Sequence, residues 1–315
     1  MTHDPATLLA FDPTDGTVIR TPPGTGYGYW VGGHKVGFDA ESGMFAVFYR
    51  ERTPLEHGRG GRCAVAVSSD GIDFTEVWSA DKAEFASSSI EVGHCLPTPD
   101  GGWRLYISYE RAGSSVWRID VMEAPAPELL QAQSRRTVLE PGEYGLSYIK
   151  DPFVYADETG YRLYAAVPAR QGPLLIGDKV QAGPLDATVL AVSDDGLIFP
   201  TIEYVFEAPG DNSWHGRRAR LSSLIPWEGG YVATWDGGRT YYDNYEEWCG
   251  LALSPDGKKF ERIDTGGPWV QSPFGSVRYV YAQRVENEVF FYYEYTREDG
   301  SHDLRVSVVG NASRS

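Results

Sequence analysis

Five polar or charged residues recur at one spacing in this chain, and their types could support acid–base chemistry. Each lies about ten residues before a segment rich in aromatics; they are His34, His94, Asp151, Arg220 and Arg278. An ordinary core strand would carry Val or Ile there, because charged groups are rarely buried without partners. Imidazoles move protons near neutral pH, and arginines grip anionic groups through paired hydrogen bonds. The spacing therefore predicts a polar ring in a functional channel, or a plug in which Asp151 pairs with the arginines.

The aromatic-rich segments that follow these residues form a repeat. Five copies occur: SGMFAVFYRER, DGGWRLYISYER, ETGYRLYAAVP, EGGYVATWDGG and ENEVFFYYEYTRE. A second element, Ser-x-Asp-Gly before an aromatic, occurs in VAVSSDGIDF, LAVSDDGLIF and LALSPDGKKF. Asp-Gly between apolar alternating runs predicts a hairpin with a type I′ turn. The aspartates Asp70, Asp195 and Asp256 are 125 and 61 residues apart, which gives a period of roughly 62 residues.

A period of this length predicts a four-stranded blade, and about five periods fit into 315 residues. We therefore expect an all-β fold, a five-bladed β-propeller of four-stranded antiparallel blades that forms a single domain over residues 1–315. The expected blades cover approximately 30–80, 85–140, 145–207, 214–265 and 272–310, and the N-terminal segment helps to close the ring. A pair of β-sandwiches is the alternative, since the period is too long for a β-helix. Only APELLQAQSRR could form a helical turn or two.

The amino-acid composition indicates which binding partners and which cellular compartment to expect. A net charge of −16 disfavours nucleic acid and anionic membranes as partners. Three cysteines without a CxxC pair disfavour a disulfide framework or a zinc-thiolate site. The first residues lack the pattern of a signal peptide, and no run approaches the roughly 20 apolar residues of a membrane span. These features predict a cytoplasmic protein.

Several other residues are candidates for contacts with a substrate near the same mouth of the channel. His215 and Arg217 precede the fourth expected inner strand. Trp30, Tyr148 and Trp214 could form walls on which a sugar ring stacks, because aromatic faces pack well against the apolar side of a sugar. Each aromatic residue could equally belong to the core.

The segment YIKDPFVYADETGYRLYAA, residues 148–166, resembles the Asp-Pro motif of the five-bladed propellers of glycoside hydrolase families 43 and 32. The Ser-x-Asp-Gly hairpins are also similar to theirs. The resemblance implies three carboxylates: a first-blade Asp as base or nucleophile, a middle Asp that tunes pKa values, and a Glu as acid. Asp151 matches the middle Asp. His34 stands where the first Asp is expected, and His215 with arginines occupies the region expected to hold the Glu.

Two of the three carboxylates are therefore not in their expected places, and three functions remain open. The first is a carbohydrate-active enzyme, a glycosidase or a sugar lyase, that acts without a cofactor on a sugar or glycoside, an anionic one among the options. In this enzyme Asp151 positions the substrate or tunes pKa values, and His34 or His94 shuttles protons. Glu91 is the candidate acid, with Glu246 or Glu247 as substitutes, and Arg220 and Arg278 bind the substrate.

The second function is a divalent-metal site built from His34, His94 and Asp151, serving a lyase, isomerase or oxygenase. Two histidines and a carboxylate with open positions suit non-haem iron, zinc or manganese. The third is a non-catalytic propeller that binds carbohydrate, keeps the aromatic walls and lacks the acid.

Overall fold

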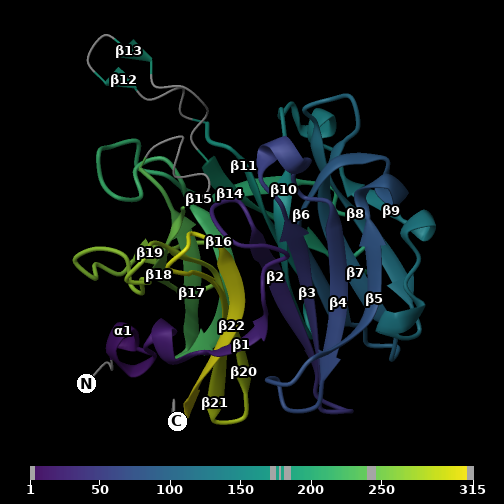
Figure 1. Cartoon of the computed structure of the whole chain (residues 1–315), viewed down its shortest axis with the longest axis horizontal. Helices are drawn as coiled ribbons and strands as arrows, with labels where there is room; N and C mark the ends of the chain where they lie inside the picture. The colour runs from purple at the N-terminus through teal and green to yellow at the C-terminus, as the bar shows by residue number, and fades with distance from the viewer. Residues whose placement is uncertain (1–3, 171–174, 177–178, 181–185, 240–245, 311–315) are drawn as a thin grey trace.

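The structure is a computed structural model, and it describes residues 4–170, 175–176, 179–180, 186–239 and 246–310 (Figure 1). The described chain is mostly β-strand. Its helices are one short α-helix, α1 (Pro5–Leu8), and 3₁₀ turns. These turns are η1 (Pro13–Asp15), η2 (Leu55–His57), η3 (Lys82–Phe85), η4 (Pro127–Leu129), η5 (Ala132–Ser134) and η6 (Pro141–Tyr144). The segment APELLQAQSRR forms η4 and η5, as expected. No helix in the described ranges is long and apolar enough to cross a membrane.

Three of the sheets are antiparallel, have four strands and follow the chain in order. The first contains β6 (Ser87–Pro97), β7 (Trp103–Arg111), β8 (Trp117–Ala124) and β9 (Arg136–Leu139). The second contains β10 (Lys150–Asp157), β11 (Gly160–Pro168), β14 (Asp186–Ser193) and β15 (Ile202–Glu207). The third contains β16 (Arg220–Trp227), β17 (Gly230–Gly237), β18 (Trp248–Ser254) and β19 (Glu261–Arg262). A separate pair is formed by β12 (Leu175–Ile176) and β13 (Lys179–Val180).

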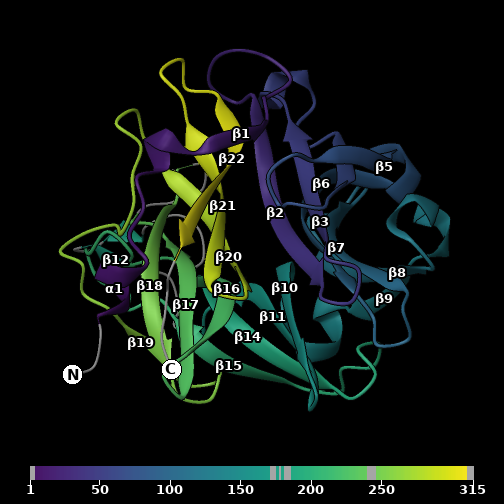
Figure 2. The ribbon, with the colours of Figure 1, turned by 90° about the horizontal axis from the view of Figure 1, so that it is seen from below.

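The remaining sheet joins the two ends of the chain. One part contains β2 (Trp30–Asp39), β3 (Met44–Arg52), β4 (Arg62–Ser68) and β5 (Thr75–Asp81). The other contains β20 (Val277–Val285), β21 (Glu288–Thr296), β22 (His302–Gly310) and the N-terminal β1 (Thr17–Arg20), which pairs antiparallel with β22. A single parallel pair, Trp30 with His302, connects the two parts. The N-terminal strand thus completes the last group of strands (Figure 2).

The first strands of these groups surround a common centre. Contacts run in a closed cycle from β2 to β6, β10, β16 and β20 and back to β2. Figure 2 shows the sheets arranged around this centre. Such a closed ring of antiparallel sheets is a β-propeller, and it leaves few exposed sheet edges.

The Ser-x-Asp-Gly segments form the turns β4–β5, β14–β15 and β18–β19, but these are not type I′ turns. In the first, Asp70 Oδ1 accepts hydrogen bonds from the backbone N–H groups of Ile72 and Asp73, at 2.8 and 2.9 Å. Only the glycine has positive φ, +74° at Gly71, whereas a type I′ turn needs positive φ at both central residues. The side chain of the aspartate, rather than its backbone, shapes the turn.

Each of these turns is also held by a tyrosine of the preceding group of strands. The hydroxyl of Tyr292 on β21 donates to Gly71 O at 2.9 Å, and Tyr106 on β7 donates to Gly196 O at 2.6 Å. Tyr164 on β11 donates to Gly257 O at 2.8 Å. The repeated aromatic strands therefore link neighbouring sheets, which explains why the two sequence repeats share one period.

Candidate functional site

Each of the five central strands contains an irregularity near its start. The register shifts lie between Gly32 and Lys35 in β2, Ile90 and Gly93 in β6, and Lys150 and Phe153 in β10. The other two lie between Leu221 and Ser223 in β16 and between Arg278 and Tyr281 in β20. A bulge adds a residue and changes the direction in which the following side chains point. The residues at equivalent depth are Gly33, Glu91, Asp151, Ser222 and Tyr279.

A left-handed backbone conformation marks three of these positions. Gly33, Asp151 and Tyr279 have φ values of +59°, +56° and +53°, in the left-handed region. This conformation is unfavourable for residues with a Cβ, and strained residues of this kind gather at functional sites. Two non-glycine residues are therefore held in strained conformations at the same end of the channel, which we call the upper mouth.

Asp151 lies at the upper mouth with a side chain that is 7% exposed. Its backbone N–H donates to Ser108 Oγ at 3.1 Å. Its carboxylate lies 3.6 Å from both Lys150 Nζ and Arg220 Nη1, yet neither oxygen accepts a hydrogen bond from a described residue. Buried carboxylate oxygens normally have donors. Asp151 is therefore a buried carboxyl group with hydrogen-bonding capacity left for a ligand or water.

Arginines and carboxylates form a continuous network beside Asp151. Arg220 contacts Asp186 Oδ2 at 2.6 Å through Nη2 and Glu247 Oε1 at 3.2 Å through Nη1. Arg278 contacts Glu247 Oε2 at 2.7 Å and Glu294 Oε1 at 2.5 Å. Burial opposes ionisation of Asp186, but the charges of Arg220 and Arg218 outweigh it and lower its pKa to about 2. The two ring arginines thus bind carboxylates of the protein.

Glu91 occupies the bulge position in β6 that corresponds to Asp151 in β10. Its carboxylate lies 3.1 Å from Arg50 Nε and 3.8 Å from Arg52 Nη1. Burial alone would raise the pKa of Glu91, but the charges of Arg50 and Arg52 outweigh it and lower that pKa well below its usual range. An ionised carboxylate cannot donate a proton, so this geometry argues against Glu91 as the acid.

The expected first-blade carboxylate is replaced by glycine, not by His34. A Cβ on Gly32 would lie 2.0 Å from Glu294 Oε2, and one on Gly33 would lie 3.1 Å from Arg50 Cγ. The side chains of Glu294 and Arg50 come from the second strands β21 and β3 and fill this space. The Gly-Gly pair is therefore required by the charged groups that pack on it.

The predicted ring is wrong at His34, because the bulge in β2 turns its side chain away from the channel. His34 is fully buried and lies beside the backbone of Tyr292 on the neighbouring strand β21. Burial, followed by the charge of Lys35, lowers the pKa of His34 to about 3. A neutral imidazole enclosed between sheets is not placed to shuttle protons to a substrate.

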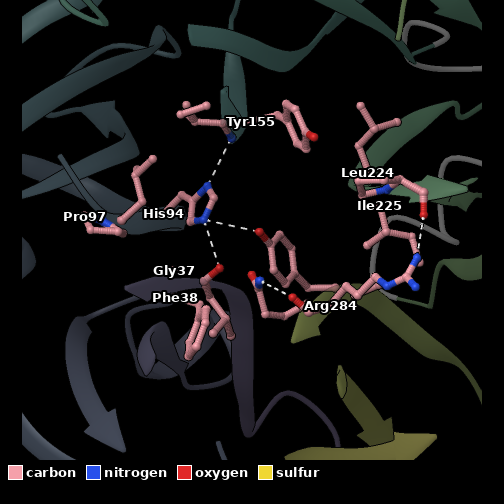
Figure 3. Close-up of a pocket in the computed structure, with 16 residues that line it drawn as sticks. Gly37, Phe38, His94, Pro97, Tyr155, Leu224, Ile225 and Arg284 are labelled. Atoms are coloured by element: carbon pink, nitrogen blue, oxygen red, sulfur yellow. Dashed lines mark hydrogen bonds between the residues drawn. The ribbon is translucent and has the colours of Figure 1, made fainter. Parts of the chain in front are cut away.

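The ring is also wrong at His94, which lies deeper than Asp151 and connects three strands. Its Nδ1 accepts a hydrogen bond from the backbone N–H of Val154 at 3.0 Å, and its Nε2 lies 3.2 Å from Val36 O (Figure 3). Nδ1 must therefore be the acceptor and Nε2 the donor. Burial lowers the pKa of His94 to about 3. Both ring nitrogens are thus occupied by backbone groups.

His94 lines a pocket at the opposite end of the channel from Asp151. The pocket has a volume of about 340 Å³ and is bounded by the later parts of β2, β6, β10, β16 and β20. Figure 3 shows His94 directed between the backbones of neighbouring strands. The hydroxyl of Tyr281 lies 3.4 Å from its Nε2. Asp151 and His94 therefore belong to different ends of the channel.

Nor does the structure assemble the proposed metal ligands. His34, His94 and Asp151 are directed to different places, and the described residues contain no group of three or more His, Cys, Asp or Glu side chains that could hold a metal ion. The deeper placement of His94 is the main reason.

The other predicted binding residues lie around the upper mouth with mixed roles. The hydroxyl of Tyr148 donates to Asp186 Oδ1. Trp214 stacks on the buried Trp235 with ring centroids 5.1 Å apart, and His215 packs edge-on against both.

Trp30 is buried, with the Arg278 guanidinium 4.8 Å above its ring. Arg217 is buried too, and its backbone carbonyl accepts from Asp186 N at 2.8 Å. Most of these residues therefore contact other protein side chains or backbone groups and hold the site in place.

Sequence reasoning missed a second ring, carried by the second strands. Because those strands run antiparallel to the central ones, their last residues return to the upper mouth. Register pairs Gly32 with Arg50, Arg220 with Asp236, and Arg278 with Glu294. The signal was present in the sequence, since the charged ends of YRER, TWDGG and YEYTRE are visible there.

Sequence reasoning also missed Lys35, because it did not foresee the bulge in β2 that turns His34 away from the channel. The bulge directs Lys35 across the channel, where its Nζ donates to Ser222 Oγ on β16 at 2.7 Å. The ammonium lies 5.9 Å and 5.6 Å from the ring centroids of Tyr279 and Tyr281. Burial lowers the pKa of Lys35 to about 8, although the carboxyls of Asp236 and Asp151 oppose this effect. Three central strands, β2, β16 and β20, thus meet around one lysine.

Comparison with solved structures identifies the fold. The chain aligns over 96% of its length with a glycoside hydrolase of the GH130 family of mannoside phosphorylases that targets β-1,2-mannosidic linkages in Candida mannan, with 94% of that chain covered, 14% identity and a TM-score of 0.63. A thermostable family-43 glycoside hydrolase gives a TM-score of 0.64 at 13% identity, covering 93% and 91% of the two chains. A glycosyl hydrolase from Bacteroides ovatus gives 0.62 at 16% identity, covering 94% and 93%.

The chain has the fold of the propeller glycoside hydrolases. No family model matches it. It is 31% identical over 175 residues to an ATP-dependent RecD2 DNA helicase from Deinococcus radiodurans, a match that covers 54% of this chain. The chain spans about a fifth of the length of that curated relative, 22%.

Proposed function

We propose that the protein is a carbohydrate-active enzyme, a single five-bladed propeller that acts on a glycoside at the upper mouth. The closed cycle of five central strands supports five blades over the ranges expected from the repeat. Neighbours with the same fold are glycoside hydrolases, which supports a carbohydrate substrate.

The observation that carries this proposal is the state of Asp151. A strained backbone holds a buried carboxylate at the start of a central strand, and its two oxygens accept no hydrogen bond from any described residue. Strain and an unsatisfied charged group have no stabilising role in a fold, so they point to a ligand. A sugar hydroxyl is a donor of the right kind for these oxygens. In this proposal Asp151 holds the substrate, while Arg220, 3.6 Å away, helps to fix the Asp151 side chain.

An anionic glycoside fits the charge at the upper mouth. The whole chain carries a net charge of −16, yet cationic groups gather at this mouth. They are Lys35, Arg50, Arg52, Lys150, Arg217, Arg218, Arg220 and Arg278. These cations outnumber the carboxylates with which they pair, Glu91, Asp151, Asp186, Glu247 and Glu294, and the excess of positive charge favours a substrate with a carboxylate or phosphate. Carboxylic acids suffice for glycoside hydrolysis, so the proposed reaction needs no cofactor.

Nucleic acid and membranes are not partners in this proposal, because the net charge of −16 repels both. The helicase activity belongs to the matched relative, of which this chain spans only 22%. A cytoplasmic location is supported by Cys63, Cys95 and Cys249, which are buried and unpaired.

The test compares Asp151→Asn with Asp157→Asn. Asp157 is the matched control because it lies on the same strand, β10, at the exposed far end. Both variants and the wild type are assayed on neutral and acidic aryl glycosides, with and without inorganic phosphate, since one structural neighbour belongs to a family of mannoside phosphorylases. We expect Asp151→Asn to lower kcat/KM by at least about 100-fold and Asp157→Asn to leave it unchanged.

Other outcomes decide between the functions. Calorimetric binding of a glycoside without turnover by the wild type indicates a binding propeller. Full activity in Asp151→Asn, with folding verified by circular dichroism, refutes the catalytic role of the upper mouth and favours a structural plug.

A further inference from the structure

The buried carboxyl groups of the upper mouth differ in one respect. All but one lie within 4 Å of a cationic nitrogen: Glu91 near Arg50, Asp151 and Asp186 near Arg220, and Glu247 and Glu294 near Arg278. The exception is Asp236, which forms no ion pair with any described residue, although its side chain belongs to a residue that is only 2% exposed. A buried carboxylate without a cation is expensive to ionise.

Asp236 lies close to the end of β17, opposite Arg220 in register. Its carboxyl oxygens share the backbone N–H of Tyr279, at 3.0 and 3.1 Å. That N–H comes from one of the strained bulge residues, so the strain at Tyr279 serves to hold this carboxyl group in place. Asp236 and Tyr279 therefore both lie at the upper mouth, which also carries Asp151.

The charges that act on Asp236 come from three neighbouring segments of the chain. Glu247 precedes β18, Arg220 belongs to β16, and Lys35 reaches in from β2. Burial and then the negative charge of Glu247 raise the pKa of Asp236 to about 7, while Lys35 and Arg220 limit the rise. The group is poised to hold and to release a proton near neutral pH.

We propose that Asp236 is the proton donor of the glycoside-cleaving site and that Lys35 is the positioning residue that controls its protonation. This inference rests on the proposed function and names the acid that its reaction requires. Asp236 replaces the Glu that the resemblance placed in the region HGRRARLSS, where arginines stand instead. The donor therefore comes from a second strand rather than from a central one.

The step balances without a further reactant beyond water. The bond between the sugar carbon and the glycosidic oxygen breaks, and its electron pair goes to that oxygen, which takes the proton of Asp236. Water adds to the sugar carbon and releases a proton to solvent. Asp236 recovers its proton from solvent, and the products are the free sugar and the alcohol of the leaving group.

Lys35 is suited to its role because it is fixed on three sides. Its ammonium donates to Ser222 Oγ and lies over the rings of Tyr279 and Tyr281, so its distance from Asp236 is set by three strands. No carboxylate of the described residues lies within 4 Å of its Nζ, and its charge therefore acts on Asp236 from beyond contact distance.

The first experiment reads protonation directly and needs no substrate. The carbonyl stretch of protonated aspartic acid is followed by infrared difference spectroscopy during a pH titration, and Asp236→Asn assigns the band. We expect a carboxyl group that titrates close to neutral pH in the wild type, shifts upward by about one pH unit or more in Lys35→Met, and stays near its place in Lys35→Arg. A band that is absent, or that Lys35→Met does not move, overturns the proposal.

The second experiment tests donation by varying the leaving group. Asp236→Asn should lower kcat roughly 10²- to 10⁴-fold on methyl glycosides, which need a proton on the leaving oxygen, and far less on 4-nitrophenyl glycosides. Asp120→Asn is the matched control: Asp120 is equally buried but is paired with Arg118, 3.1 Å away in the β6–β9 sheet. Equal losses on both substrates in Asp236→Asn contradict the donor role.

The two failures are distinguishable. A wild type that neither turns over nor binds any glycoside refutes the proposed function and the donor role together, whatever the infrared band shows. Turnover that is lost in Asp151→Asn but retained on methyl glycosides in Asp236→Asn refutes the donor role alone.

Discussion

Replacing His34 tests whether this residue is a buried neutral group or a proton shuttle. Its pKa in the folded protein is about 3, against 6.5 for an exposed histidine, because burial and the charge of Lys35 both oppose protonation. The unfolded chain therefore binds a proton that the folded protein does not. Stability from this source is complete above pH 6.5 and is lost as pH falls toward 3.

The magnitude follows from the two pKa values. A difference of one between the folded and unfolded pKa corresponds to about 1.4 kcal/mol, so the whole effect is about 5 kcal/mol at pH 3. Between pH 7 and pH 5 the loss is about 2 kcal/mol, since the folded imidazole stays neutral over this range. Groups that face His34, namely Lys35, Arg50, Glu294 and the backbone of Tyr292, remain in both proteins compared.

The assay is urea unfolding of the wild type and His34→Leu at pH 7 and pH 5, followed by tryptophan fluorescence. We expect the wild type to lose about 2 kcal/mol more than His34→Leu between the two pH values. His94 and Asp236 titrate in both proteins, so their contributions cancel in the difference. His57→Leu is the control, because His57 is exposed on η2 and meets solvent in both states. Parallel losses in the wild type and His34→Leu would refute the burial of a neutral His34.

Two further substitutions test the framework of the site. Gly33→Ala should lower the free energy of unfolding by about 1–3 kcal/mol more than Gly43→Ala: both glycines have positive φ, but only at Gly33 does a Cβ meet a side chain, Arg50 at 3.1 Å. Equal losses in urea unfolding would remove the close packing of Arg50 as the reason for the Gly-Gly pair. Arg220→Met should destabilise by about 3–5 kcal/mol, because it leaves Asp186, Glu247 and Asp151 without their shared cation. Thermal unfolding unchanged in Arg220→Met would show that the network is dispensable.

The repeat indicated the propeller fold from residue types and spacing alone. Turns with Asp-Gly and aromatic strands are local features, and their period of roughly 62 residues reflects the sheets that the structure contains. Asp151 could be identified from the sequence because it lies near the start of its strand, in a short Asp-Pro motif about ten residues before an aromatic-rich segment. The turn type was misjudged, since Asp70 accepts hydrogen bonds with its side chain while only Gly71 adopts positive φ.

What the sequence could not determine is the direction of side chains after each bulge. One added residue in β2 moves His34 out of the channel and Lys35 into it, because successive side chains of a strand point to opposite faces. The protonation of Asp236 likewise depends on Glu247 and Lys35, which are brought to it from other strands. Charge and burial act through space, and only the closed ring of sheets places these three groups together; residue types and spacing alone therefore located Asp151 but could not reveal its proposed partner.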